Sequence, residues 1–344
     1  MAADIVGERI EQLRRRYGAG LMILGHFYQR DSVIKHADRV GDSLELARAA
    51  ADSSALRIVL CGVRFMAESA CILAGPERSV YMPDAGAGCP MAAMADPDQV
   101  ERAWRDLGGD AAGFLPVVYV NSSAAVKALC GRWGGSTCTS SNARRVFEWV
   151  FSQGRRVFFL PDEHLGINTA EDMGLRRSET AVYDPRREGG GLARADLDRA
   201  RVVVWKGFCV VHMAFTADLV MAVRRAHPEA KIIVHPETPS DVVRLCDAHG
   251  STSQIVRYVE EAPDGSLIVV GTEQHLVERL AEKWRGRKTV KALAGSVCAN
   301  MARTTPEALL ALLERWPESL RVTVDPGAAA DARLALNRML ALAK

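Results

Sequence analysis

Two distant stretches of this 344-residue sequence repeat one another at a constant offset of 209 residues. Self-similarity at a fixed offset is the signature of a duplicated structural unit. The matching landmarks recur without a gap, in the pairs His26 and His235, Ser43 and Thr252, Gly62 and Gly271, and Cys89 and Cys298. We therefore expect at least two copies of one folding unit.

A looser third copy lies between these two stretches. It carries Tyr119 and Asn121 at the end of an apolar run. Ser140 then precedes a helical pattern, and Cys209 follows a glycine-containing turn. The interval from Ser140 to Cys209 is 69 residues, against 46 in the first copy, and the polar, glycine-rich stretch 184–198 can hold the excess. The sequence therefore predicts three homologous units.

Short apolar runs alternate with segments of helical periodicity along the chain. The runs lie at 21–24, 58–61, 117–120, 157–160, 202–205, 232–234 and 267–270. Such alternation is typical of βαβ units with parallel sheets, so we expect an α/β protein. The first unit is expected to span 1–92 and to be completed by C-terminal helices at 303–344. The second and third are expected at 93–210 and 211–302.

Charge and hydropathy argue against two classes of partner. The 44 Lys and Arg residues against 42 Asp and Glu leave a formal net charge of +2, which is too small for charge-driven nucleic-acid binding. No run approaches the roughly 20 apolar residues of a membrane span. Residues 1–16 also lack the apolar core of a secretory signal. We expect a cytoplasmic protein that binds neither nucleic acid nor membrane.

Each unit carries polar side chains where α/β sheets bind their ligands. One follows a strand, a hydroxyl group stands at a helix start, and a cysteine follows a glycine-containing turn. Strand carboxyl ends form ligand crevices, and helix N-termini favour anions. The hydroxyls of Ser43, Ser140 and Thr252 are also expected to cap their helices, a role compatible with anion binding. If the units pack around a pseudo-threefold axis, the three cysteines converge beside these hydroxyls.

Three of the eight cysteines, Cys89, Cys209 and Cys298, occupy the repeated position. No C-x-x-C pair is present, which argues against local zinc-ribbon and thioredoxin patterns. Structural zinc usually takes four ligands, whereas three cysteines around a [4Fe–4S] cluster leave one iron open as a Lewis acid for dehydration chemistry. The alternative is that the three are buried packing residues, as Cys61 is expected to be within its apolar run.

Eight segments, in order along the chain, resemble the quinolinate synthase family. They are GHFYQ at 25–29, GDSLELA at 41–47, YVNSS at 119–123, CTSSN at 138–142, WKGFCVVH at 205–212, VHPE at 234–237, GSTSQ at 250–254 and VGTE at 270–273. Each segment is weak evidence alone, but together they cover most of the chain with consistent spacing. The sequence is similar to this family over about residues 20–302.

The resemblance implies an enzyme of de novo NAD biosynthesis, quinolinate synthase (EC 2.5.1.72). Its reaction condenses iminoaspartate with dihydroxyacetone phosphate to quinolinate, phosphate and water. The family also implies three three-layer αβα units with parallel sheets around a pseudo-threefold axis. One [4Fe–4S] cluster per chain is implied, held by Cys89, Cys209 and Cys298, and L-aspartate oxidase is the expected source of iminoaspartate.

The resemblance extends to the remaining candidate site residues. Glu237 is expected to be the general acid and base, because water elimination and aldose–ketose shifts need a positioned base. The Tyr28 phenol is expected to shuttle a proton. By its spacing from Cys209, His212 could ligate a metal, but the family implies a catalytic contact with substrate near the cluster. The expected substrate-binding residues are His26, Ser43, Tyr119, Asn121, Ser140, His235 and Thr252.

Two alternative functions stay open at this point. Another [4Fe–4S] hydro-lyase would share the open iron but would not need a phosphate site. A non-enzymatic iron–sulfur sensor would not need acid–base side chains beside the cysteines. Enzyme and sensor are therefore distinguished by the distance from the cysteines of four side chains, namely His26, Tyr28, His212 and Glu237.

Overall fold

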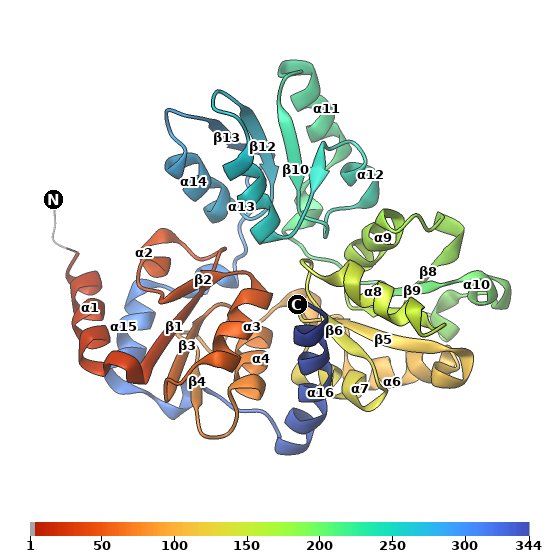
Figure 1. The fold of residues 1–344 in the computed structure, drawn as a ribbon, viewed down its shortest axis with the longest axis horizontal. Coiled ribbons are helices and arrows are strands. Elements are labelled where there is room, and N and C mark those ends of the chain that lie inside the picture. Colours follow the sequence, from red (N-terminus) through yellow and green to blue (C-terminus); the bar gives the residue numbers. More distant parts are fainter. Residues whose placement is uncertain (1–3, 344) are drawn as a thin grey trace.

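The computed structural model describes residues 4–343, in which three β-sheets with their helices lie around a common centre (Figure 1). The strands are β1 Leu21–His26, β2 Arg39–Gly41, β3 Arg57–Cys61, β4 Ser79–Tyr81, β5 Phe114–Tyr119, β6 Ser136–Cys138, β7 Arg156–Leu160, β8 Thr180–Tyr183, β9 Val202–Trp205, β10 Lys231–Val234, β11 Ala248–His249, β12 Leu267–Gly271, β13 Thr289–Ala292 and β14 Arg321–Val322. Every strand expected from an apolar run is present.

The α-helices are α1 Ile5–Tyr17, α2 Asp31–Ile34, α3 Ser43–Asp52, α4 Arg64–Ala74, α5 Pro90–Ala93, α6 Pro97–Asp106, α7 Ala124–Arg132, α8 Ala143–Ser152, α9 Glu163–Asp172, α10 Arg194–Arg199, α11 Ala217–Ala226, α12 Ser240–Val243, α13 Thr252–Glu261, α14 Gln274–Lys283, α15 Pro306–Arg315 and α16 Pro326–Leu342. Short 3₁₀ turns are η1 Gly18–Gly20, η2 Gly109–Ala112, η3 Arg177–Glu179, η4 Glu188–Gly191, η5 His212–Ala214, η6 Met301–Arg303 and η7 Glu318–Leu320. Within residues 4–343, no helix combines the length and apolarity needed to cross a bilayer.

The three sheets share one strand order. Reading across each sheet, the common part is β2-β1-β3-β4, β6-β5-β7-β9 and β11-β10-β12-β13. All strand pairs within these sets are parallel, and the antiparallel pair is β14 with β4. The α/β fold with parallel sheets is therefore confirmed. The rotation that relates the units stays a prediction.

The repeat extends to individual hydrogen bonds. Asp38 Oδ2 accepts from the backbone N–H of Ile23 at 2.7 Å, and Asp247 Oδ2 accepts from that of Ile232 at 2.7 Å. Each aspartate also donates its own backbone N–H to the carbonyl of the isoleucine whose N–H it accepts. These pairs differ by the offset found in the sequence, so the same side-chain bond braces β1 and β10 at equivalent positions.

The longer middle unit contains one additional strand. After α9 the chain forms β8, which pairs parallel to β9 at the edge of the second sheet, and then η4 and α10 before it enters β9. The polar stretch 184–198 lies in this excursion. The common strand order of the sheet is therefore kept although the chain is longer.

The C-terminal segment joins two parts of the molecule. The leucines of α15 pack with α1 residues in one apolar cluster, and β14 extends the first sheet. The last helix, α16, packs mainly on α7 and also contacts α4, so it lies between the first and second sheets (Figure 1). The unit boundaries at 1–92, 93–210 and 211–302, with 303–344 completing the first, stay predictions.

We expect Gly131→Ala to loosen the packing of α16 on α7. A Cβ atom at Gly131 would lie 1.9 Å from the backbone oxygen of Asp331, so one helix must shift. The cost should be about 1–3 kcal/mol of unfolding free energy, although alanine favours the helix itself. Chemical denaturation followed by tryptophan fluorescence measures this loss.

Gly20→Ala is the matched control, because a Cβ atom there would meet nothing within 4 Å. It should change the unfolding free energy by less than about 0.5 kcal/mol. A Gly131→Ala protein as stable as wild type would contradict the tight helix contact.

Candidate functional site

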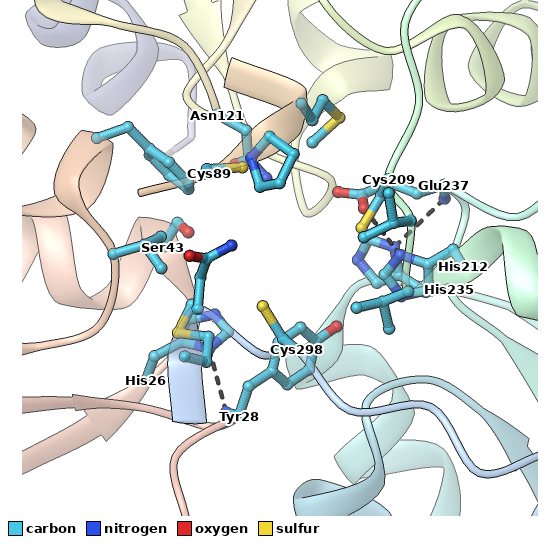
Figure 2. A pocket seen from close by; sticks show the side chains of 18 of the residues that line it. His26, Tyr28, Ser43, Cys89, Asn121, Cys209, His212, His235, Glu237 and Cys298 are labelled. Carbon is cyan, nitrogen blue, oxygen red and sulfur yellow. Dashed lines mark hydrogen bonds and ion pairs between the residues drawn. The ribbon is translucent and has the colours of Figure 1, made fainter. Parts of the chain in front are cut away.

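The carboxyl ends of the three sheets surround one cavity of about 280 Å³. Its lining includes every candidate site residue from the sequence: His26, Tyr28, Ser43, Cys89, Tyr119, Asn121, Ser140, Cys209, His212, His235, Glu237, Thr252 and Cys298. Figure 2 draws side chains around the open space and labels ten of these residues. The structure thus brings together residues from across the chain, while their chemical roles stay proposals.

The strand-end residues reach the cavity in the same way in each sheet. His26 is the last residue of β1, Tyr119 is the last residue of β5, and His235 directly follows β10. These three strands hold the same place in their sheets. Because strand carboxyl ends form the ligand crevice of an open parallel sheet, three such edges here enclose one space.

The three repeated cysteines lie in the loops that follow β4, β9 and β13. Cys89, Cys209 and Cys298 are each partly exposed, and Figure 2 shows their sulfur atoms on different sides of the same cavity. The other cysteines do not line it; they are Cys61, Cys71, Cys130, Cys138 and Cys246. The cavity therefore offers three thiols to a metal group.

Burial raises the pKa of all three cavity thiols. The pKa of Cys89 is raised to about 12, and that of Cys209 is raised further by the charge of Glu237. The pKa of Cys298 is also raised by burial. Because thiolates are the metal-binding form, metal binding at these cysteines must release protons.

Two of the helix-start hydroxyls do not cap their helices. Ser43 and Thr252 are the first residues of α3 and α13, and the preceding Asp42 and Ser251 are the caps. Ser140 lies in the turn before α8. The expected capping role is therefore wrong, because a residue already in helical conformation directs its side chain away from the free N–H groups. Their hydroxyls consequently line the cavity.

Asp42 joins the three units beside the cavity, a role that the sequence did not indicate. Its Oδ1 accepts from the backbone N–H of Glu45 at 3.0 Å, within its own helix. Its Oδ2 accepts from the Ser141 hydroxyl at 2.6 Å and from the Ser253 hydroxyl at 2.8 Å. The sequence feature that could have identified Asp42 is its position 209 residues before Ser251, the equivalent helix cap in the third unit.

Two equivalent histidines are held in the same tautomer. The backbone N–H of Tyr28 donates to His26 Nδ1 at 3.1 Å, and that of Glu237 donates to His235 Nδ1 at 3.3 Å. Each neutral ring therefore carries its proton on Nε2, and His235 Nε2 lies 3.2 Å from the Ser140 hydroxyl. Burial lowers the pKa of His26 to about 4 and that of His235 to about 3.

Glu237 lies at the centre of a buried hydrogen-bond network. The Tyr119 hydroxyl donates to its Oε1 at 2.5 Å, and His212 Nδ1 lies 2.8 Å from its Oε2. Burial opposes ionisation of Glu237, but its electrostatic interactions with the His235 and His212 rings and these two hydrogen bonds outweigh burial and lower its pKa. The Glu237 carboxylate is therefore ionised and held at both oxygens.

The Tyr28 phenol is positioned by two threonines. It lies 2.8 Å from the Thr272 hydroxyl, and the Thr252 hydroxyl donates to it at 3.4 Å. His212 Nε2 lies 3.5 Å from the same Thr272 oxygen. Burial raises the pKa of Tyr28, with a further contribution from the charge of Glu237, so the phenol stays protonated. Thr272 therefore links Tyr28 to His212. It was not a predicted site residue, although it belongs to the VGTE segment at 270–273 that resembles the family.

Two buried ionisable groups nearby were also not predicted. Asp162 caps α9, and its Oδ2 has no partner among the described residues. Burial and the charge of Glu237 raise the pKa of Asp162, whereas the pKa of Glu237 is lowered. Lys127 is fully buried on α7, donates to the Ser122 carbonyl at 2.5 Å, and has its pKa lowered by burial to about 8.

Two features of the cavity suit it to ligand binding. Asn121 lines it, and its buried Oδ1 has no partner among residues 4–343. Cys209, His212 and Glu237 each offer a ligand atom, and these atoms lie within 4.8 Å of one another. The cavity therefore has both an unused hydrogen-bond acceptor and donor atoms suited to a metal.

Known proteins similar to this chain share one description. The profile of the family described as "Quinolinate synthetase A protein" matches residues 8–341. A quinolinate synthase of Geobacillus sp. (strain WCH70) is 46% identical over 100% of this chain and 95% of its own length. Those of Acidobacterium capsulatum and Corynebacterium glutamicum are each 45% identical, covering 97% and 98% of this chain and 92% and 88% of their own lengths.

We expect unfolding to become easier in mild acid because His26 is buried in its neutral form. Its pKa is 6.5 in the unfolded reference and about 4 in the fold, so the unfolded chain binds the proton first as pH falls. Stability is therefore greatest above about pH 6.5 and is lost as the pH falls toward 4. Asparagine at this position does not titrate and offers an acceptor oxygen in place of Nδ1.

The test compares urea unfolding of wild type and His26→Asn at pH 7 and pH 5. The stability difference between the two proteins should shift by about 2 kcal/mol in favour of the variant at the lower pH. A repeat at pH 7 and pH 8 should show no such shift. Parallel pH profiles between pH 7 and pH 5 would contradict the buried neutral histidine.

Proposed function

The chain belongs to the quinolinate synthase family, and on that premise we propose that it condenses iminoaspartate with dihydroxyacetone phosphate to quinolinate, phosphate and water. The observation that carries the proposal is the single cavity. It combines three cysteines with the acid–base side chains of Tyr28, His212 and Glu237. A non-enzymatic sensor would not need these acid–base side chains.

Cys89, Cys209 and Cys298 are the proposed ligands of a [4Fe–4S] cluster. No other cysteine of the described residues lines the cavity, so the protein supplies three thiolates. When bound there, the cluster supplies one iron without a protein thiolate, a Lewis acid that polarises a substrate hydroxyl or carboxylate. The donor set therefore fits the group that the family implies.

Glu237 is the proposed general base. Its carboxylate is ionised, buried and oriented by Tyr119 and His212. Water elimination and aldose–ketose shifts each require removal of a proton from carbon, and an ionised carboxylate in a fixed position accepts it. The protonated form can then return the proton to a leaving hydroxyl. His212 keeps Glu237 aimed into the cavity and lies where it can contact substrate.

The Tyr28 phenol is the proposed proton donor. Its pKa is raised by burial, so the phenol carries its proton through the working pH range. Thr272 and Thr252 hold the hydroxyl. A protonated phenol opposite an ionised carboxylate separates the acid role from the base role within one cavity.

The substrates carry two carboxylates and a phosphate, which need several anion-binding groups. The hydroxyls of Ser43 and Thr252 line the cavity at the N-terminal ends of α3 and α13, where the helix dipole favours anions. Neutral His26 has an Nε2–H to donate, and the Nε2–H of His235 lies beside the Ser140 hydroxyl at 3.2 Å. These groups, with Ser140, Tyr119 and Asn121 on the remaining wall, form the proposed substrate contacts. An L-aspartate oxidase is the proposed source of iminoaspartate.

The first experiment measures iron, sulfide and product. Anaerobically purified protein should contain about four irons per chain and should form quinolinate from the two substrates. An intact cluster without product would favour another hydro-lyase or a sensor. Competition by dihydroxyacetone phosphate, which a hydro-lyase without a phosphate site would not show, separates the proposed reaction from that of another hydro-lyase.

Serine replacements should separate the ligand cysteines from the others. Cys89→Ser, Cys209→Ser and Cys298→Ser should each lose the cluster after anaerobic reconstitution, because two thiolates are too few to hold it. Cys61→Ser is the control, since Cys61 is buried in β3 away from the cavity. Iron analysis and the cluster's visible absorption measure the result. Equal iron content in all four variants would contradict the assignment.

Glu237→Gln should keep the cluster and lose turnover. The amide preserves the shape and a hydrogen bond to Tyr119 but does not accept a proton, so kcat should fall about 10²–10⁴-fold. Iron content serves as the folding control in the same sample. Wild-type kcat in this variant would remove Glu237 from the acid–base role.

A further inference from the structure

A mixed sulfur, nitrogen and oxygen ligand set lies at one side of the cavity. Ligand atoms of Cys209, His212 and Glu237 lie within 4.8 Å of one another. We propose that in the cluster-free protein these three residues bind one divalent zinc ion, and that the bound zinc blocks cluster assembly. The zinc site itself is independent of the proposed reaction, whereas the blocking effect rests on the proposed cluster ligands.

The local chain geometry places two of the ligands in one turn. The His212 backbone N–H donates to the Cys209 carbonyl at 3.1 Å, so residues i and i+3 face the same side. The His212 ring stacks on the His235 ring with 4.5 Å between centroids and 20° between planes. The imidazole is therefore held in place before any metal arrives.

The third ligand is oriented by its own hydrogen bond. The Tyr119 hydroxyl donates a hydrogen bond to Glu237 Oε1, and Glu237 Oε2 faces His212 Nδ1. A cation entering between them replaces the contact of Oε2 with Nδ1 and keeps the bond to Tyr119. Such outer partners fix a carboxylate ligand and strengthen metal binding.

Charge and burial favour a dication of intermediate softness. His212 and Glu237 are 1% and 3% exposed. A thiolate and a carboxylate carry two negative charges, which one dication neutralises in this buried position. Sulfur and imidazole ligands select Zn²⁺ over Mg²⁺ and Ca²⁺, and three protein ligands leave the fourth position to a water on the cavity side.

The proposed zinc and cluster sites share Cys209. Within residues 4–343, no other group of three His, Cys, Asp or Glu ligand atoms has comparable spacing, so one ion per chain is expected. Cys89 and Cys298 are outside this set. Zinc at Cys209 would therefore withhold one thiolate from a three-cysteine cluster.

The probe is Co²⁺, which replaces zinc and reports its ligands by absorption. Chelator-treated, cluster-free protein is titrated anaerobically with Co²⁺ and then with Zn²⁺. The expected result is a sulfur-to-cobalt charge-transfer band that saturates at one Co²⁺ per chain and is abolished by Zn²⁺. Absence of the band in wild-type protein would overturn the proposal.

Variants identify the ligands. Cys89→Ser and Cys298→Ser should keep the cobalt band, although neither can hold a three-cysteine cluster. Cys209→Ser should lose it, and His212→Gln should weaken cobalt binding at least tenfold. Loss of the band in Cys89→Ser or Cys298→Ser to the same extent as in Cys209→Ser would overturn the triad in favour of a three-cysteine site.

The blocking effect is tested on the wild-type protein. One equivalent of Zn²⁺ added before iron and sulfide should prevent reconstitution, and a chelator should restore it. Full reconstitution with zinc still bound would overturn the blocking effect. Cobalt binding does not depend on quinolinate formation, so failure of the proposed reaction and failure of the zinc site are separate results.

Discussion

The buried carboxyl group of Asp42 ties together the three helix starts that surround the cavity. It caps its own helix and accepts hydrogen bonds from Ser141 and Ser253, which belong to the other two units. Three parallel sheets have no intrinsic reason to direct their carboxyl ends at one another. A shared acceptor at the junction, together with α16 across α4 and α7, holds them in that arrangement. The cavity exists because these edges are kept facing inward.

Because the groups that line this cavity are buried, their hydrogen-bond and electrostatic partners decide whether each of them is charged. Glu237 is ionised because two hydrogen-bond donors and the nearby histidines outweigh desolvation, whereas burial raises the pKa of Asp162, which has one oxygen without a partner among the described residues. His26 and His235 are neutral because each accepts a backbone N–H while buried. A site with a fixed base, protonated donors and neutral hydrogen-bonding rings suits proton transfer on anionic substrates.

The sequence predicted the sheet interiors better than their edges. The buried strands β1, β3, β7 and β12 were visible as apolar runs. The edge strands β2 and β13 were not, because most of their residues are exposed and carry no apolar pattern. The functional residues followed the same rule. The repeat singled out Cys89 and Cys298, but Asp42 escaped notice because its repeat partner is a serine, and its role depends on chain segments that meet only in the fold.

The sequence alone determined the α/β class, the three-unit repeat and the candidate site residues, all of which line the cavity. These follow from local periodicity and from an offset that preserves each residue's place on its strand or helix. Only the tertiary structure decided which partners these residues have. Ser43 and Thr252 are free of capping, Glu237 lies between Tyr119 and His212, and Asp42 bridges three units. The contacts of Glu237 with Tyr119 and of Asp42 with Ser141 and Ser253 join residues 118, 99 and 211 positions apart. Their geometry is set by packing, which no local pattern encodes.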